Sequence, residues 1–246
     1  MKKIFISDKL ANDGVNYLKA QDDIEIHFEV GLSKAVNAEI VCFDCDSTLS
    51  KIEGIDELAR RVGLGEELAK LTDAAMNGDV ALEDIYGKRL DLIKPNRDAI
   101  DWLADLYIAE LVDGVVEVFA ELQKYNKTVH IISGGLLPAI LPLAKLLGVS
   151  ESNVHAVDVY FAENGNYLNY ETESPLAKNG GKAKVIKSLQ ATSLVMIGDG
   201  KTDLEAKQAG AKVIGFGGVV NRKLVCENAD FFVADKNLTA VLPYIL

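Results

Sequence analysis

Two aspartates, Asp44 and Asp46, stand one residue apart directly after the apolar run of residues 41–43. This position indicates that both side chains leave a strand where it emerges from a core. Like charges this close repel each other, and burying carboxylates without partners is costly. The spacing therefore predicts a charged site rather than a solvated turn.

Three later segments carry chemically useful residues in similar positions, each at the end of a strand pattern or the start of a helical one. They are SGG at 133–135, GGK ending at Lys182, and GDGKTD at 198–203. In an open parallel sheet the carboxyl ends of the strands converge on one crevice. We therefore expect Asp44, Asp46 and Asp199 to meet there, together with the Ser133 hydroxyl and the Lys182 ammonium.

Oxygen ligands without a thiolate or an imidazole favour Mg²⁺ as the cofactor of such a site. A divalent cation beside Lys182 would also supply the local positive charge that an anionic substrate needs in an acidic protein. The formal net charge is −11, from 26 basic and 37 acidic residues. That balance argues against nucleic acid or an anionic membrane as a partner.

The elements that must position these residues follow an α/β pattern, in which short apolar strands alternate with longer helical segments. Strands are expected at 41–46, 128–133, 193–199, 212–218 and 230–235, and helices at 113–126, 136–148, 181–190 and 201–210. A hairpin is expected at 157–172, with its turn at 164–166. The compact apolar strands are typical of a parallel sheet buried on both faces.

Residues 51–110 interrupt this alternation with four successive helical patterns, at 55–63, 65–78, 82–93 and 96–111. A helical block that directly follows the two aspartates is well placed to act as a lid. The sequence thus predicts a core from 41–50 and 111–246, a helical cap at 51–110, and an N-terminal extension at 1–40.

The remaining reactive residue types give no second site. Cys42 and Cys45 form a C-x-x-C, but three residues apart on a strand they point to opposite faces, and we expect small buried residues. His27, His130 and His155 have no partners at a useful spacing and are assigned no role. Neither a secretory signal nor a membrane span is visible, so we expect a cytoplasmic protein.

The quoted motifs, in this order, resemble the haloacid dehalogenase superfamily of phosphohydrolases. More narrowly, VCFDCDSTLSKIEGIDELAR, ISGG, NGGKAKVIKSL and MIGDGKTDLEA are similar to the phosphoserine phosphatases, from about residue 40 to the end. The resemblance implies a parallel-sheet core with a helical cap inserted after the first core strand. It also implies hydrolysis of a small phosphomonoester, O-phospho-L-serine, to L-serine and phosphate in serine biosynthesis.

The resemblance further implies a role for each matching core residue. Asp44 would be the nucleophile that forms an aspartyl-phosphate, and Asp46 the general acid and then the general base. Mg²⁺ would be held by Asp44, the main-chain carbonyl of Asp46, and Asp199. The core residues that bind substrate would be Ser133, Gly134, Gly135, Lys182 and Thr202. Asp203 would orient Lys182 from behind.

The cap would select the substrate, again by resemblance. Glu53, nine positions after Asp44, would contact the ammonium group of phosphoserine. Arg89 would grip its carboxylate with two parallel hydrogen bonds. Met76 would line an apolar wall over the substrate.

Residues 1–35 resemble instead the start of a D-2-hydroxyacid dehydrogenase, such as phosphoglycerate dehydrogenase. We expect a strand at 3–7, a helix at 10–20 and a strand at 24–30. No G-x-G-x-x-G dinucleotide fingerprint follows, so a working dehydrogenase is excluded. We expect this segment to dock or to form a homodimer.

Two alternatives remain open from the sequence. The chain could act on another small phosphomonoester, or pass the phosphoryl group to an acceptor such as homoserine. It could also be a regulatory protein whose N-terminal segment docks with a dehydrogenase, in which case little or no hydrolysis is expected.

Overall fold

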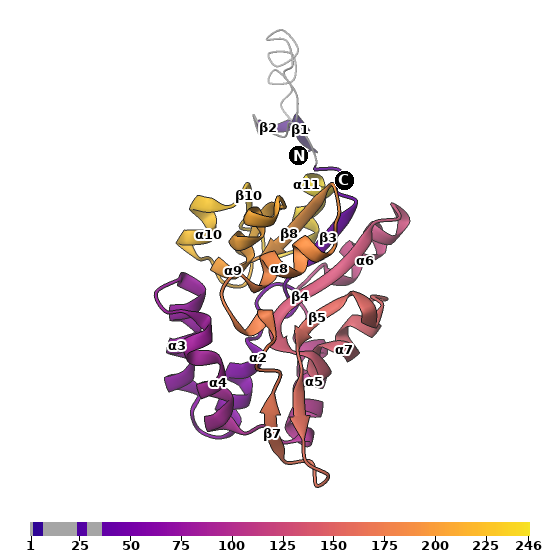
Figure 1. Cartoon of the computed structure of the whole chain (residues 1–246). Helices are drawn as coiled ribbons and strands as arrows, with labels where there is room; N and C mark the ends of the chain where they lie inside the picture. Colours follow the sequence, from indigo (N-terminus) through magenta and orange to yellow (C-terminus); the bar gives the residue numbers. More distant parts are fainter. Residues whose placement is uncertain (1, 7–23, 29–35) are drawn as a thin grey trace.

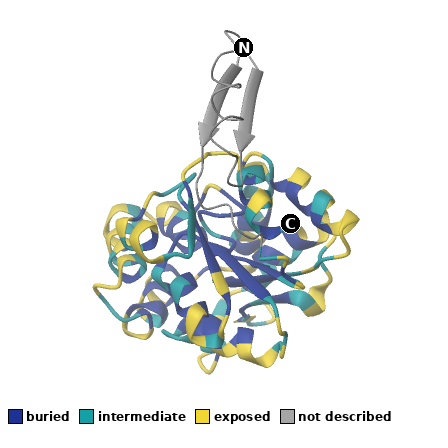
Figure 2. Ribbon diagram, turned by 90° about the horizontal axis from the view of Figure 1, so that it is seen from above, coloured by how far each residue is buried: buried dark blue, intermediate teal, exposed yellow. Residues whose placement is uncertain are grey.

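A computed structural model describes residues 2–6, 24–28 and 36–246 of the chain. Its centre is a six-stranded parallel sheet of order β10-β9-β8-β3-β4-β5, with helices on both faces (Figures 1 and 2). The strands are β3 (Ile40–Phe43), β4 (Thr128–Leu136), β5 (Val154–Val157), β8 (Leu194–Gly198), β9 (Lys212–Phe216) and β10 (Phe231–Val233). The predicted α/β fold is confirmed, and β5 is one strand more than the sequence predicted.

Strand β3 shows why these segments form a central sheet. Val41, Cys42 and Phe43 are all completely buried, and successive side chains point to opposite faces. Both faces of the strand are therefore covered, as in other parallel sheets. The chain order runs from β3 to β4 and β5 on one side and to β8, β9 and β10 on the other. Such a reversal opens a crevice at the carboxyl end of β3.

Six α-helices belong to the core. They are α6 (Val115–Lys124), α7 (Leu137–Leu146), α8 (Gly181–Ser188), α9 (Lys201–Leu204), α10 (Lys223–Asn228) and α11 (Leu242–Ile245). Short 3-10 helices lie at η1 (Glu151–Asn153), η2 (Pro175–Ala177), η3 (Glu205–Ala209) and η4 (Leu238–Val241). The single helix predicted at 201–210 is thus divided into α9 and η3, and Gly210 ends it at φ 85°.

Four helices between β3 and β4 form the cap, as the sequence predicted. They are α2 (Gly54–Arg61), α3 (Gly65–Asn77), α4 (Leu82–Ile93) and α5 (Arg97–Ala109), and they lie at one end of the sheet (Figure 1). Asn96 is the N-cap of helix α5, and its side chain accepts the N–H of Ala99 over 2.9 Å. Its buried residues follow the helical period on one face: Ile100, Leu103, Ala104 and Tyr107.

The predicted hairpin is formed by β6 (Val159–Phe161) and β7 (Tyr167–Tyr170), which pair antiparallel. It contacts the cap as well as the core. The rings of Tyr86 on α4 and Tyr170 on β7 have centroids 5.2 Å apart, and the Arg97 N–H donates to the Gly165 carbonyl over 2.9 Å. The hairpin therefore supports the cap from the core side.

The N-terminal extension contains β1 (Lys2–Ile6) and β2 (Ile24–Phe28), which pair parallel as a separate two-stranded sheet. These two strands confirm the strand predictions. The helix predicted at 10–20 lies outside the described residues. Within the described part of the chain, no helix has the length and apolar character needed to cross a bilayer.

Candidate active site

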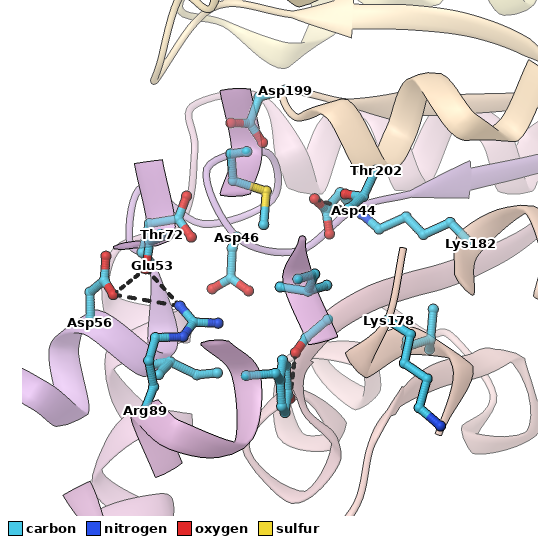
Figure 3. Close-up of a pocket in the computed structure, with 16 residues that line it drawn as sticks. Asp44, Asp46, Glu53, Asp56, Thr72, Arg89, Lys178, Lys182, Asp199 and Thr202 are labelled. Carbon is cyan, nitrogen blue, oxygen red and sulfur yellow. Dashed lines mark hydrogen bonds and ion pairs between the residues drawn. The ribbon is translucent and has the colours of Figure 1, made fainter. Parts of the chain in front are cut away.

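A pocket at the carboxyl end of the sheet, beneath the cap, collects residues from both parts of the molecule (Figure 3). The predicted site residues that line it are Asp44, Asp46, Glu53, Met76, Arg89, Gly134, Lys182, Asp199 and Thr202. It is also lined by Ile55, Asp56, Thr72, Leu82, Tyr86, Leu176 and Lys178. The remaining predicted residues, Ser133, Gly135 and Asp203, are buried next to it.

Lys182 joins two of the carboxylates. Its Nζ lies 2.8 Å from Asp44 Oδ2 and 2.6 Å from Asp203 Oδ1, and all three residues are buried. Burial alone would lower the pKa of Lys182, but Asp203 and Asp44 raise it above its ordinary value. The lysine therefore stays cationic beside Asp44. The other oxygen, Asp44 Oδ1, accepts the N–H of Cys45 over 2.8 Å.

Asp46 occupies a different environment, although it is only two residues from Asp44. Its Oδ1 accepts the Gly54 N–H and the Tyr107 hydroxyl, both over 2.7 Å. The chain turns between the strand and α2 at Ser47, where φ is 52°. Burial and then the charge of Asp44 raise the pKa of Asp46 to about 6. One carboxylate is thus paired with a lysine, while the other can hold a proton, so the two environments differ as those of two carboxyl groups with different roles do.

Gly54 makes the contact with Asp46 possible. A Cβ at this position would lie 2.0 Å from the Tyr107 hydroxyl oxygen, far inside contact distance. Because only glycine lacks this atom, the backbone N–H can approach the carboxylate while Tyr107 donates to the same oxygen.

The carboxylates of Asp44, Asp199 and Asp203 could hold a divalent metal ion, because one oxygen from each lies within 4.8 Å of the others. Burial and then the charges of Asp44 and Asp203 raise the pKa of Asp199 to about 8. Burial also raises the pKa of Asp203 to about 7. A bound cation would favour the ionised forms of all three, and the oxygen-only donor set fits a hard ion.

Asp203 has other bonds besides its place in this cluster. Its Oδ1 accepts a hydrogen bond from Lys182 Nζ, and its Oδ2 accepts the Gly200 N–H over 2.9 Å. Asp203 thus contacts Lys182 directly, and its role in orienting the lysine stays a prediction. Coordination of a metal ion by the main-chain carbonyl of Asp46 stays a prediction.

The SGG segment lies inside β4, which continues to Leu136, so the prediction that the strand ends at residue 133 is wrong. The Ser133 hydroxyl accepts the Gly135 N–H over 2.9 Å and lies 3.5 Å from Asp46 Oδ2. From the cap, the Tyr86 hydroxyl donates to the Gly134 carbonyl over 2.7 Å. The segment therefore lies beside the two aspartates, as expected, with a direct bond to the cap.

The cap side of the pocket presents Glu53 and Arg89. Glu53, immediately before α2, accepts the Ser47 hydroxyl over 2.8 Å. Burial and then Asp46 and Asp199 raise its pKa well above the ordinary value. Arg89 is buried on α4, and its Nη1 donates to the Thr72 hydroxyl over 2.6 Å. Its Nε is also buried and has no hydrogen-bond partner among the described residues. Its guanidinium thus retains a donor for a ligand.

Several residues of the site were missed in the sequence, most notably Arg222, whose Nε donates to Asp199 Oδ2 over 3.2 Å. Arg222 follows the expected strand at 212–218, so the rule that found Asp199 at a strand end could have found it. Tyr86 and Tyr107 gave no signal, because they lie on apolar helix faces that look like ordinary core. Thr72 and Asp56 gave no signal for another reason: in the sequence they look like polar residues on the solvent-exposed face of a helix.

Comparison with known proteins decides the family. Residues 38–210 match the haloacid dehalogenase-like hydrolases. The chain belongs to this family. A phosphoserine phosphatase of Homo sapiens is 38% identical over 203 residues, which covers 81% of this chain and 90% of that protein. A chloroplastic phosphoserine phosphatase of Arabidopsis thaliana is 37% identical, covering 80% of this chain and 69% of the relative.

A solved structure described as a phospho-aspartyl intermediate analogue of phosphoserine phosphatase is also similar. Its TM-score is 0.74 at 26% identity, and the match covers 84% of this chain and 98% of that one. The predicted membership of the haloacid dehalogenase-like hydrolases and the predicted fold are both confirmed. The chain is an enzyme of this family. The region that matches its phosphatase relatives includes both the core and the cap.

Proposed function

We propose that this phosphatase hydrolyses O-phospho-L-serine to L-serine and inorganic phosphate, with Mg²⁺ as its cofactor. One observation supports the chemistry above the others: the Lys182 ammonium lies between Asp44 and Asp203, at 2.8 and 2.6 Å, in a buried pocket. The names of the similar proteins support the choice of substrate, and Glu53 and Arg89 on the cap side supply complementary charges.

In this mechanism a carboxylate oxygen of Asp44 attacks phosphorus, and the bond from phosphorus to the serine oxygen breaks. Asp46 gives its proton to that oxygen and then takes a proton from the water that hydrolyses the aspartyl-phosphate. Lys182 offsets the negative charge of the phosphate. Mg²⁺, held by Asp44, Asp199 and the Asp46 carbonyl, would supply further charge neutralisation for in-line transfer.

The remaining residues bind and orient the substrate. The phosphate oxygens would be bound by Ser133, Gly134, Gly135, Lys182 and Thr202. On the cap side, Glu53 would accept the substrate ammonium and the free donors of Arg89 would hold its carboxylate, while Met76 would cover the apolar part. This division explains why the pocket combines core and cap residues.

Release of inorganic phosphate from O-phospho-L-serine, measured with Mg²⁺ and after chelation with EDTA, tests the proposal. We expect turnover only with the metal. Other small phosphomonoesters should be poorer substrates by kcat/KM, and added alcohols such as homoserine should not divert the phosphoryl group. Equal or better turnover of another phosphomonoester, or transfer to an alcohol, would replace the substrate assignment.

Arg89→Ala tests the substrate contact directly. We expect kcat/KM for O-phospho-L-serine to fall about 10- to 100-fold, because a charge-assisted pair is lost. Lys88→Ala is the matched control, since it removes the same charge from an exposed neighbour on α4. If both variants behaved like the wild type, Arg89 would not contact the substrate.

Further parts of the proposal concern the whole protein. We propose the division into an extension at 1–40, a core at 41–50 and 111–246, and a cap at 51–110. We also propose a cytoplasmic enzyme of serine biosynthesis, without nucleic acid or membrane partners, that dimerises through residues 1–40. The pocket lining favours the enzyme over the regulatory alternative, because the proposed catalytic side chains Asp44, Asp46 and Lys182 all line it.

A further inference from the structure

Arg222 lies in the core between β9 and α10, and its guanidinium contacts three carboxylates from different elements. Its Nε donates to Asp199 over 3.2 Å and its Nη1 donates to Asp73 over 3.0 Å. Its Nη2 lies 3.8 Å from Glu53 Oε1. Asp199 follows β8, Glu53 precedes α2, and Asp73 is on α3. We call these four residues the Arg222 cluster.

Two members of the Arg222 cluster, Asp199 and Glu53, line the pocket, and the Arg222 guanidinium lies beside both of their carboxylates. Arg222 is buried, with 4% of its side chain exposed, and such a charge is stable only with close partners. A planar guanidinium presents several donors in a fixed fork, so it can contact several carboxylates together, which an ammonium cannot do as well. Arg222 therefore holds both pocket carboxylates in place.

The third carboxylate, Asp73, is different because it does not line the pocket and its side chain is 65% exposed. Its bond to Arg222 crosses from the core to the cap, between residues 149 positions apart in the chain. Because the cap helices cover the pocket, this ion pair joins α3 to the core beside the pocket.

We propose that Arg222 is a positioning residue that couples closure of the cap to the arrangement of Asp199 and Glu53. Through Asp73 the guanidinium holds α3 on the core, and through its other donors it orients the two pocket carboxylates. Its effect on substrate affinity rests on the proposed function, in which Glu53 accepts the substrate ammonium. Its effect on cap closure does not.

Amide hydrogen exchange of the ligand-free full chain tests the contact with the cap. In Asp73→Asn, we expect amides of α3 to exchange about two- to fivefold faster than in the wild type, the range typical of a partly exposed ion pair. Asp79→Asn, which neutralises an exposed acid just after α3, should exchange like the wild type. Equal exchange in Asp73→Asn and Asp79→Asn would overturn the proposal.

Arg222→Lys provides a second test, because lysine keeps a charge beside Asp199 but cannot span all three partners. We expect faster α3 exchange in this variant, with no further increase when Asp73→Asn is added, since residues acting through one interaction are not additive. Fully additive effects would show that the two residues act independently and would contradict the coupling.

Kinetics with O-phospho-L-serine and Mg²⁺ test the link to substrate binding. In Asp73→Asn we expect KM to rise about two- to fivefold and kcat to stay within about twofold, because closure is weakened and the reacting groups are intact. Lower kcat at unchanged KM would contradict a positioning role. If the wild type did not hydrolyse O-phospho-L-serine, the proposed function would fail, whereas the exchange experiments would still decide the contact with the cap.

Discussion

At the scale of single residues, the two aspartates after β3 differ in their partners rather than in their chemical type. Asp44 is paired with Lys182, whereas Asp46 accepts the Gly54 N–H and the Tyr107 hydroxyl. The first pairing places an ammonium group against the Asp44 carboxylate, and the second surrounds a carboxyl group, that of Asp46, whose pKa is raised by burial and then by Asp44. The two side chains can therefore perform different steps of one reaction.

Asp44→Asn should abolish turnover, because an amide oxygen of nearly the same size is a far weaker nucleophile. We expect phosphate release to fall at least about 10³-fold. Circular dichroism should show an unchanged fold, since the substitution conserves volume at a buried position. Measurable turnover near the wild-type rate would rule out Asp44 as the nucleophile.

A pair of histidines provides a pH-dependent contribution to stability that the sequence did not indicate. His130 Nδ1 lies 3.1 Å from His155 Nε2 and the rings are stacked, so the expectation that neither has a partner is wrong. Burial and then His155 lower the pKa of His130 to about 4, and burial lowers that of His155. Below the ordinary histidine pKa the unfolded chain therefore binds more protons than the folded one, and acid destabilises the fold.

His130→Gln should reduce this acid sensitivity. Lowering the pH from 7.5 to 5 should reduce the unfolding free energy of both proteins. We expect the reduction to be about 1–2 kcal/mol larger in the wild type, because the lowered pKa of His130 is lost in the variant. Urea unfolding at the two pH values measures the difference. An equal loss of unfolding free energy in both proteins would show that the histidine pair does not cause the acid sensitivity in this pH range.

At the scale of elements, the cap is held to the core by contacts on different helices. Tyr86 on α4 donates to Gly134 and packs against Tyr170 of the hairpin, while Asp73 on α3 contacts Arg222. Each contact joins segments separated by many residues along the chain. The position of the cap over the pocket therefore depends on the hairpin and the Arg222 cluster together.

Tyr170→Ala should weaken the contact between the hairpin and α4. We expect KM for O-phospho-L-serine to rise about 2- to 10-fold, because an aromatic pair contributes roughly 0.5–1.5 kcal/mol beyond its buried area. The control is Tyr170→Phe, which keeps the ring and should match the wild type. An unchanged KM in Tyr170→Ala would mean that the hairpin does not support the cap.

At the scale of the whole molecule, every proposed catalytic and binding residue lies between Asp44 and Arg222, outside the N-terminal extension. Deletion of residues 1–35 should therefore leave kcat within about twofold of the full chain. If the extension mediates dimerisation, light scattering should show a smaller particle after the deletion. Unchanged mass, stability and activity would contradict a docking role.

Much of the architecture follows from local sequence, because hydrophobic periodicity is a property of neighbouring residues. The cap helices, the hairpin and five sheet strands were predicted in this way. Positions at the end of a strand, for Asp44 and Asp199, or at the start of a helix, for Lys182, placed these residues in one site. The prediction for 201–210 was less accurate, since the local pattern did not distinguish an α-helix from the 3-10 turn that follows α9.

Tertiary structure alone decided which side chains became partners. Arg222 meets Asp73 across 149 residues, Tyr107 meets Asp46 across 61, and His130 meets His155 on the neighbouring strand. Such pairs depend on how helices and strands pack, which the period of a single segment does not specify. The sequence therefore determined the residue types at the end of each strand, whereas packing determined the charge, protonation and hydrogen bonds of each one.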